Sequence, residues 1–81
     1  MESPGEVSAR AARGDRAAFS ELMRQTKAAL FRFIRRYVGD EQEAWDLLQD
    51  TYAAAWLSIR RYDPARPFDA WLRTIALNKC R

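Results

Sequence analysis

The sequence predicts an all-α fold, a small bundle of three main helices preceded by a short N-terminal helix. Apolar residues recur at helical spacing through most of the 81 residues. Alternating runs of β-branched residues do not occur, and the chain holds only two valines and three isoleucines. Ten aromatic residues and 48% hydrophobic content can supply a core, and a chain of this length forms one domain.

The N-terminal part predicts one short helix and the start of a long one. Residues 1–6 are expected to be a flexible N-terminus, and the domain is expected to cover residues 7–81. Val7–Arg13 can form a short helix that ends at Gly14. Asp15 stands where an N-cap belongs, so a second helix is expected over about Arg16–Tyr37.

The second helix carries an apolar stripe about 120° wide at 100° per residue. Phe31 lies off this stripe and is expected either to contact a partner or to pack on the N-terminal helix. The stripe consists of Phe19, Leu22, Met23, Thr26, Leu30, Phe33, Ile34 and Tyr37.

Two further helices follow. Asp40 and Glu43 have the spacing of a capping box and predict a third helix over about Glu41–Arg61. Residues 63–67 contain two prolines and predict a turn, after which a last helix runs from Phe68 to Arg81. The inner face of the third helix is expected to hold Trp45, Leu48, Tyr52, Ala55, Trp56 and Ile59, and that of the last helix Phe68, Trp71, Leu72 and Ile75. The last helix meets no capping residue, so the domain is expected to be truncated at its C-terminal end.

The composition excludes several classes of protein. Histidine is absent and Cys80 is the single cysteine, so no disulfide within the chain, Cys/His zinc site or histidine-dependent nucleophile can form. No glycine-rich phosphate loop occurs, and the longest apolar run, residues 53–57, is too short to span a membrane. The acidic start is unlike a signal peptide. We expect a cytoplasmic, non-enzymatic binding module without a metal or cofactor.

Charge is unevenly distributed along the chain. The net charge is +3, but residues 40–57 contain five acidic and no basic residues, whereas residues 58–81 contain six basic and two acidic ones. An acidic surface suits a basic protein partner, and a basic surface suits nucleic acid. The alternative is that a small helical domain simply has solvated charged faces.

The third helix is expected to present an outer stripe away from its core face. The helix dipole explains carboxylates in its first turn, but neither an acidic residue in its third turn nor an exposed leucine at its end. An acidic and apolar stripe suits contact with a helix of another protein, whereas two carboxylates alone are too few ligands for a metal site. We call Asp46, Gln49, Asp50, Ala53 and Leu57 the outer stripe.

The last helix combines basic and aromatic residues that can contact nucleic acid. Phe68 and Trp71 could stack on unpaired bases, although their spacing also fits a core position. Asn78 can donate and accept at the edge of a base. The candidate DNA-binding residues are Phe68, Trp71, Arg73, Asn78, Lys79 and Arg81. Cys80, on the side of Arg73, is expected to be a structural thiol or a neutral surface thiol.

Three segments are distinctive in their order and spacing: GDRAAFSEL at residues 14–22, DLLQDTYAAAW at residues 46–56 and RPFDAWLRTIALN at residues 66–78. Together they resemble the σ2 domain of a bacterial RNA polymerase sigma factor of the extracytoplasmic-function (ECF) group. The resemblance covers about residues 8–81 and implies a helical bundle that binds core RNA polymerase and promoter DNA. Anti-sigma proteins hold many such factors, so one is an expected partner.

The resemblance also assigns roles to individual positions. It implies that Asp46, Gln49 and Asp50 dock on the clamp coiled coil of the β′ subunit. It implies that residues 68–81 face the −10 element, help to open the duplex and hold an unpaired non-template base. Asn78 is expected near that base, with Arg73, Lys79 and Arg81 at phosphates. The family's segments that complete −10 recognition and read the −35 element lie beyond the residues matched.

Two other functions stay open. One is a helix-turn-helix protein that binds duplex DNA, which would need a short turn and an exposed basic recognition helix. The other is a protein-interaction bundle with no role in DNA binding.

Overall fold

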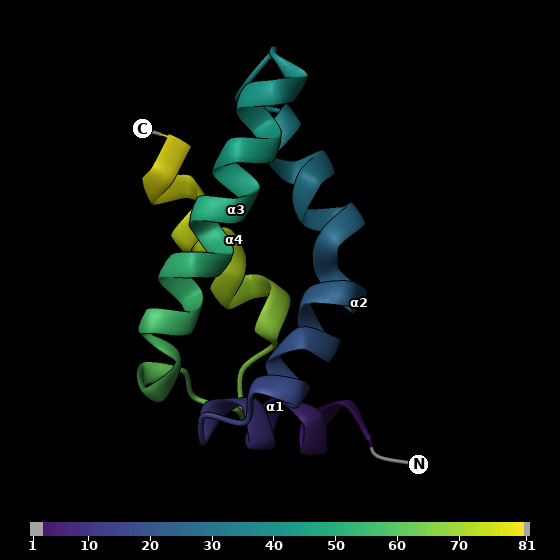
Figure 1. Cartoon of the computed structure of the whole chain (residues 1–81), viewed down its shortest axis with the longest axis vertical. Coiled ribbons are helices and arrows are strands. Elements are labelled where there is room, and N and C mark those ends of the chain that lie inside the picture. Colours follow the sequence, from purple (N-terminus) through teal and green to yellow (C-terminus); the bar gives the residue numbers. More distant parts are fainter. Residues whose placement is uncertain (1–2, 81) are drawn as a thin grey trace.

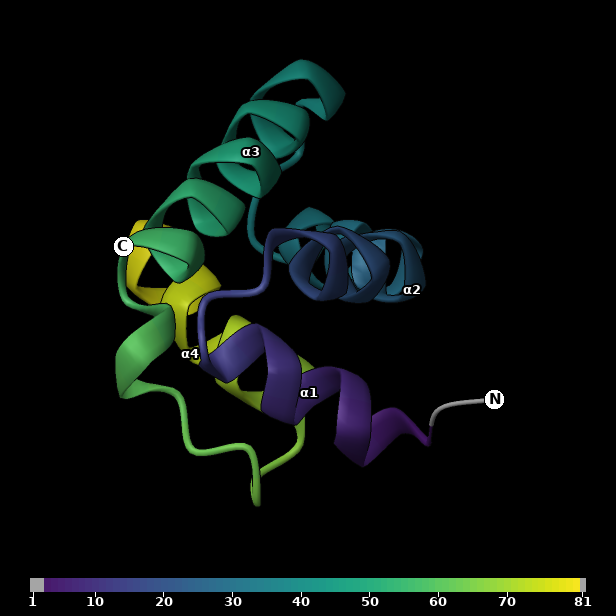
Figure 2. The same ribbon diagram turned by 60° about the horizontal axis from the view of Figure 1, so that its bottom comes forward.

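The fold is a bundle of helices in a computed structural model that describes residues 3–80. The elements are α1 (Pro4–Ala12), α2 (Arg16–Arg35), α3 (Glu41–Leu57), a 3₁₀ turn η1 (Ile59–Arg61) and α4 (Phe68–Cys80). The longer helices α2, α3 and α4 pack on one another, and α1 lies across the end of the bundle at which α2 begins (Figures 1 and 2). The predicted all-α bundle with a short N-terminal helix is confirmed.

The first helix begins earlier than predicted. It starts at Pro4 rather than Val7, because Ser3 caps it by accepting a hydrogen bond from the backbone N–H of Glu6. The helix also has proline in its first turn, where the fixed φ angle of proline matches the helical backbone. The first helix therefore includes residues 4–6, which the sequence placed before it, and residues 1 and 2 lie outside the described residues.

The joint between α1 and α2 combines a glycine turn with an aspartate cap. Gly14 has a φ of 94°, a left-handed conformation that glycine adopts without steric cost. Asp15 then accepts from the N–H of Ala18 at 3.1 Å and from Nε of Arg10 at 2.9 Å. The hydrogen bond from Ala18, followed by that from Arg10, lowers the pKa of the Asp15 carboxyl. The predicted N-cap is confirmed.

The core is built from large side chains on α2, α3 and α4, with alanines where helices approach closely. A polar contact crosses this core: the hydroxyl of Thr26 lies 2.7 Å from that of Tyr52, which donates to the carbonyl of Met23 at 3.2 Å. Burial raises the pKa of Tyr52. The buried apolar residues include Phe19, Leu22, Leu30, Ile34, Leu48, Tyr52, Phe68 and Leu72, and alanines 11, 18, 44, 55 and 76.

The C-terminal end of α2 departs from the predicted stripe. The helix ends at Arg35, two residues before the predicted end, and Tyr37 is 56% exposed while Val38 is buried instead. Phe31 packs neither on α1 nor outward, because its ring stacks on Trp45 of α3 at a centroid distance of 4.1 Å. Beyond Arg35 the backbone leaves the helix, so helical spacing no longer predicts which side chains face the core.

The third helix is shorter than predicted. Asp40 caps it as expected, accepting from the N–H of Gln42 at 3.1 Å. It ends at Leu57 instead of Arg61, and the backbone N–H of Ser58 bonds to the carbonyls of Ala54 and Ala55. The chain then tightens into η1, which still buries Ile59 in the core. A 3₁₀ turn at a helix end is common and leaves no strong sequence signal.

Candidate docking and nucleic-acid surfaces

The outer stripe lies on the solvent side of α3, as predicted. Its five residues, Asp46, Gln49, Asp50, Ala53 and Leu57, are all exposed. Leu57 has 87% of its surface exposed and lies at the C-terminal end of the helix. Leu47, next to Asp46 on the same helix, is half-buried and packs against the core.

The two carboxylates of the stripe differ in their surroundings. Asp46 accepts a hydrogen bond from Nε2 of Gln42 at 3.2 Å, one turn earlier on the helix. Within residues 3–80, Asp50 makes neither an ion pair nor a side-chain hydrogen bond. An ionised carboxylate held on a rigid helix without an internal partner can pair with a cation of another protein at little reorganisation cost. The stripe therefore has the composition of a contact surface for a helix with basic residues.

The two aromatic candidates on α4 differ in depth, because Phe68 is buried and Trp71 is half-buried. Phe68 is only 5% exposed and packs edge-on against Phe19 at 6.0 Å and Tyr62 at 5.4 Å. Its side chain is therefore part of the core and does not present a face on which a base could stack. Trp71 is half-buried, tilted against Tyr62 at 5.0 Å, and keeps part of its ring at the surface.

The polar candidates on α4 are exposed. Arg73 donates to Oδ2 of Asp69 at 3.1 Å, an ion pair one turn apart on the helix surface. Exposed pairs of this kind contribute little stability, so Arg73 can exchange Asp69 for a phosphate. Asn78 and Lys79 also lie at the surface, near the end of the helix. Arg81 lies outside the described residues.

The segment before α4 contains a feature that the sequence reasoning missed. The hydroxyl of Tyr62 donates to the carbonyl of Arg66 at 2.5 Å, which closes the turn at residues 62–67. The Tyr62 ring is buried against Phe68 and Trp71, and burial raises its pKa. Tyr62 thus fixes both the turn and the position of Trp71. A tyrosine directly before a proline-containing segment was the available signal.

Two further findings concern the described residues. Among residues 3–80, no three Cys, Asp or Glu side chains are placed to hold a metal ion. No helix in the part of the chain described here is long and apolar enough to cross a membrane. The structure thus defines a helical module with one acidic, apolar surface on α3 and one basic surface on α4.

Comparison with known proteins agrees with that description. Residues 22–81 match the family model of sigma-70 region 2, and the chain belongs to this family, which is not a class of enzymes. It is 41% identical to the RNA polymerase sigma factor CnrH of Cupriavidus metallidurans over 75 residues, which are 93% of this chain and 39% of CnrH. It is 32% identical to the ECF sigma factor SigW of Bacillus subtilis, over 82% of this chain and 35% of SigW. The chain thus spans about two fifths of the length of these relatives.

Two solved structures share the fold. CnrH in complex with the cytosolic domain of CnrY matches with a TM-score of 0.87 and 39% identity, covering 99% of this chain and 52% of that one. An engineered region 2 of sigmaE in complex with GTAAAA matches with a TM-score of 0.86 and 25% identity, covering 98% of this chain and 82% of that one. The predicted resemblance to an ECF-type σ2 domain is confirmed.

Proposed function

We propose that this chain is the module of an ECF-type sigma factor that attaches the factor to core RNA polymerase and opens the promoter −10 element. The outer stripe on α3 docks on the clamp coiled coil of the β′ subunit. The observation that carries this assignment is the stripe itself, in which Asp50 has no ion-pair partner among residues 3–80 and Leu57 is exposed on the same helix face. Apolar area there supplies affinity, and the carboxylates set orientation.

The outer face of α4 receives the non-template strand in this proposal. Lys79 and Arg73 neutralise phosphates, and Asn78 reads the edge of an unpaired base beside the exposed part of Trp71. Phe68 acts from the core by holding Trp71 in place. Opening the duplex costs a few kcal/mol per unstacked base, offset by stacking and polar contacts to the displaced base. The solved sigmaE region 2 in complex with GTAAAA supports this role.

The chain makes or breaks no bond in this mechanism, so no residue is assigned a catalytic role. The CnrH structure contains the cytosolic domain of CnrY, which supports a protein partner of the same kind. We propose that this partner is an anti-sigma factor, which would place the protein in the cytoplasm together with the polymerase.

The docking proposal is tested by measuring binding of the chain to the isolated β′ clamp coiled coil. We expect the variant Asp46→Ala/Gln49→Ala/Asp50→Ala to bind at least tenfold more weakly while its helical circular dichroism is unchanged. The variant Glu41→Ala/Glu43→Ala is a matched control, because it removes two carboxylates from the first turn of the same helix. It should retain binding within about threefold, as expected for exposed charges outside the contact.

Two results would contradict the docking proposal. Equal losses in both variants would show that net charge, and not the stripe, determines binding. Absence of binding by the folded wild-type chain would remove the stripe from polymerase attachment and favour the other two functions, a duplex DNA binder or a protein-interaction bundle.

A further inference from the structure

The turn that leads into α4 is held by hydrogen bonds more than by packing on the core. Its residues 63–67 are all exposed, and a cavity of about 550 Å³ lies between residues 64–67 and α2. Inside the turn, Asp63 accepts from the N–H of Arg66 at 2.9 Å through its carbonyl and from that of Ala65 at 3.0 Å through Oδ1. These bonds shape the turn but do not attach it to the helices, so its attachment depends on flanking residues.

Tyr62 is the flanking residue that joins the turn to α4. Its side chain is buried, and its hydroxyl donates to the carbonyl of Arg66 at 2.5 Å. Its ring centroid lies 5.0 Å from that of Trp71 and 5.4 Å from that of Phe68. A change in the orientation of this one side chain would therefore move both the turn and the half-buried ring of Trp71.

Ser8 of α1 contacts the hydroxyl of Tyr62. Ser8 is buried and lines the cavity beside the turn. Burial raises the pKa of Tyr62, and a side-chain hydrogen bond with Ser8 lowers it by a smaller amount. The single hydroxyl proton of Tyr62 goes to the carbonyl of Arg66, so Ser8 is the donor in this bond. The buried hydroxyl of Thr51, by contrast, bonds within its own helix, to the carbonyl of Leu47.

The first helix is itself firmly attached. The bond from Arg10 to Asp15 ties α1 to the cap of α2. At its C-terminal end, a Cβ atom placed on Gly14 would lie 3.0 Å from Nη2 of Arg60, so the guanidinium of Arg60 in η1 lies directly against this turn. Helix α1 therefore contacts the segment before α4 at two points and gives Ser8 a fixed position.

We propose that Ser8 is a positioning residue for the DNA-facing part of the chain, acting through Tyr62 on the turn before α4 and on the exposed part of Trp71. The two hydrogen bonds form a chain in which Tyr62 both accepts and donates, and each bond in such a chain strengthens the other. The effect on DNA rests on the proposed function, in which Trp71 lies beside the unpaired base. The link from Ser8 to Trp71 does not depend on it.

The experiment places a fluorine probe on the tryptophans. The chain is labelled with 5-fluorotryptophan, and the three ¹⁹F signals are assigned by single substitutions to phenylalanine. Ser8→Ala should move the signal of Trp71 and leave that of Trp45, which lies on α3 away from Tyr62. Amide exchange at residues 63–67 should be at least threefold faster than in wild type.

The consequence for DNA is measured with a fluorescent single strand that contains GTAAAA, the sequence in the solved sigmaE complex. Ser8→Ala should bind it at least threefold more weakly, because Trp71 is no longer held in one orientation. Binding to the β′ clamp coiled coil should change by less than twofold, since the outer stripe lies on α3.

The matched control is Val7→Ala, because Val7 is the neighbour of Ser8 and both residues are 8% exposed. It removes buried atoms from the same helix and leaves the hydrogen-bond chain complete. It should lower the denaturation midpoint at least as much as Ser8→Ala does. The Trp71 signal and the affinity for the single strand should nevertheless stay at the wild-type values.

A double-mutant cycle tests whether Ser8 acts through Tyr62. Tyr62→Phe removes the middle hydroxyl of the chain. In that background Ser8→Ala should change neither the Trp71 signal nor the affinity for the single strand any further, whereas independent effects would add.

Three outcomes would overturn the proposal: an unmoved Trp71 signal in Ser8→Ala, the same movement in Val7→Ala, or an undiminished effect of Ser8→Ala in the Tyr62→Phe background. If the wild-type chain does not bind the single strand, the proposed DNA role fails, and the Trp71 signal and amide exchange still decide the role of Ser8. If the strand binds but Ser8→Ala leaves the Trp71 signal in place, the role of Ser8 fails and the DNA role stands.

Discussion

Asp15 is a single residue with two tasks, because it caps α2 and accepts a hydrogen bond from Arg10. Its pKa is lowered in the folded chain, so the stabilisation it provides is fully present above its unfolded pKa of about 3.9. That stabilisation is lost as the pH falls through the folded pKa. The sign follows because the unfolded chain takes up a proton at this carboxyl before the folded chain does.

We therefore expect Asp15→Asn to flatten the loss of stability at acid pH. Asparagine can still accept the hydrogen bond from Ala18 but cannot ionise or pair with Arg10. Urea unfolding followed by circular dichroism from pH 2 to pH 7 measures this, and the variant should be less stable than wild type at pH 7 and approach it at pH 2. Parallel curves for the two proteins would show that Asp15 does not contribute to the acid sensitivity.

At the residue scale, features that depend on neighbouring positions could be predicted from the sequence better than contacts between distant positions. The caps at Asp15 and Asp40 depend on neighbours a few positions away, and both were predicted from the sequence. The burial of Phe68 depends on Phe19, which lies 49 positions earlier in the chain. Helical spacing placed Phe68 on the inner side of its helix but could not say whether part of the ring would stay exposed.

At the scale of elements, the turn between η1 and α4 contains a side-chain hydrogen bond from Tyr62 to the carbonyl of Arg66. Asp63 adds two more hydrogen bonds, accepting from the N–H of Arg66 at its carbonyl and from the N–H of Ala65 at Oδ1. Tyr62→Phe keeps the ring in contact with Trp71 and removes the hydroxyl, which bonds to the Arg66 carbonyl and also interacts with the side chain of Ser8. We expect a loss of about 1 kcal/mol in the free energy of unfolding, the usual net contribution of a hydrogen bond in a partly buried site. Denaturant unfolding measures the loss, and amide exchange should be faster at residues 63–67 than in wild type.

The control for this prediction is Tyr37→Phe, since Tyr37 is exposed and its hydroxyl can bond to water in both states. It should change stability by less than about 0.5 kcal/mol. Equal effects of the two substitutions would mean that the hydroxyl of Tyr62 does not hold the turn.

The positions at which helices end were harder to predict from the sequence than the helices themselves. The order and number of the α-helices were predicted, because each has an apolar stripe and most have a readable cap. The ends of α2 and α3 were misplaced, since Tyr37 and Ile59 continue the apolar spacing although the backbone has already left the α-helix. Spacing of side chains does not record where the backbone hydrogen bonds end.

At the scale of the whole molecule, the proposed protein and DNA surfaces lie on different helices. Asp50 and Lys79 share no hydrogen bond or ion pair in the described part of the chain. We expect Asp50→Ala to weaken binding to the clamp coiled coil without changing affinity for single-stranded DNA. Lys79→Ala should weaken binding to single-stranded DNA and lower its salt slope by about one.

The two effects should be additive in the double variant, within about 0.5 kcal/mol on each affinity. Fluorescence anisotropy with labelled oligonucleotides and with the labelled coiled coil measures both. A coupling above that value would mean that α3 and α4 transmit changes to one another.

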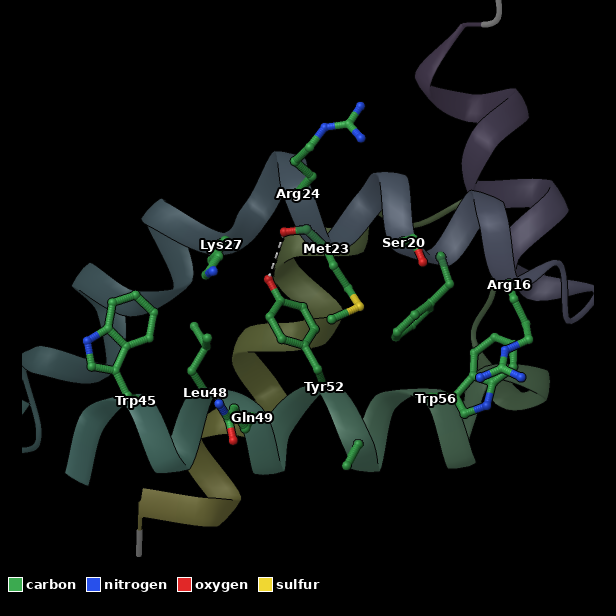
Figure 3. A pocket seen from close by; sticks show the side chains of 12 residues that line it. Arg16, Ser20, Met23, Arg24, Lys27, Trp45, Leu48, Gln49, Tyr52 and Trp56 are labelled. Carbon is green, nitrogen blue, oxygen red and sulfur yellow. Dashed lines mark hydrogen bonds between the residues drawn. The ribbon is translucent and has the colours of Figure 1, made fainter. Parts of the chain in front are cut away.

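The groove between α2 and α3 is also a property of the whole molecule (Figure 3). Arg16 lies over the ring of Trp56, and Lys27 lies over that of Trp45. All four residues are visible in the sequence, but their pairing depends on the alignment of two antiparallel helices. No local pattern specifies that alignment. The outer stripe, by contrast, was predictable because its five residues share one face of one helix.

The hydrogen bond between Tyr52 and Thr26 affects which alignment of the helices is the most stable in this small bundle. Ala44, Ala55 and Ala76 are fully buried, and their methyl groups offer much the same smooth surface after one helix slides by a turn along another. Apolar area alone would therefore distinguish poorly between such neighbouring arrangements. Such a shift would separate the Tyr52 hydroxyl from Thr26 and from the Met23 carbonyl. The unsatisfied polar groups would then cost about 1–3 kcal/mol. This penalty falls on every misaligned arrangement and not on the native one, so one polar pair gives an alanine-rich interior a single preferred alignment.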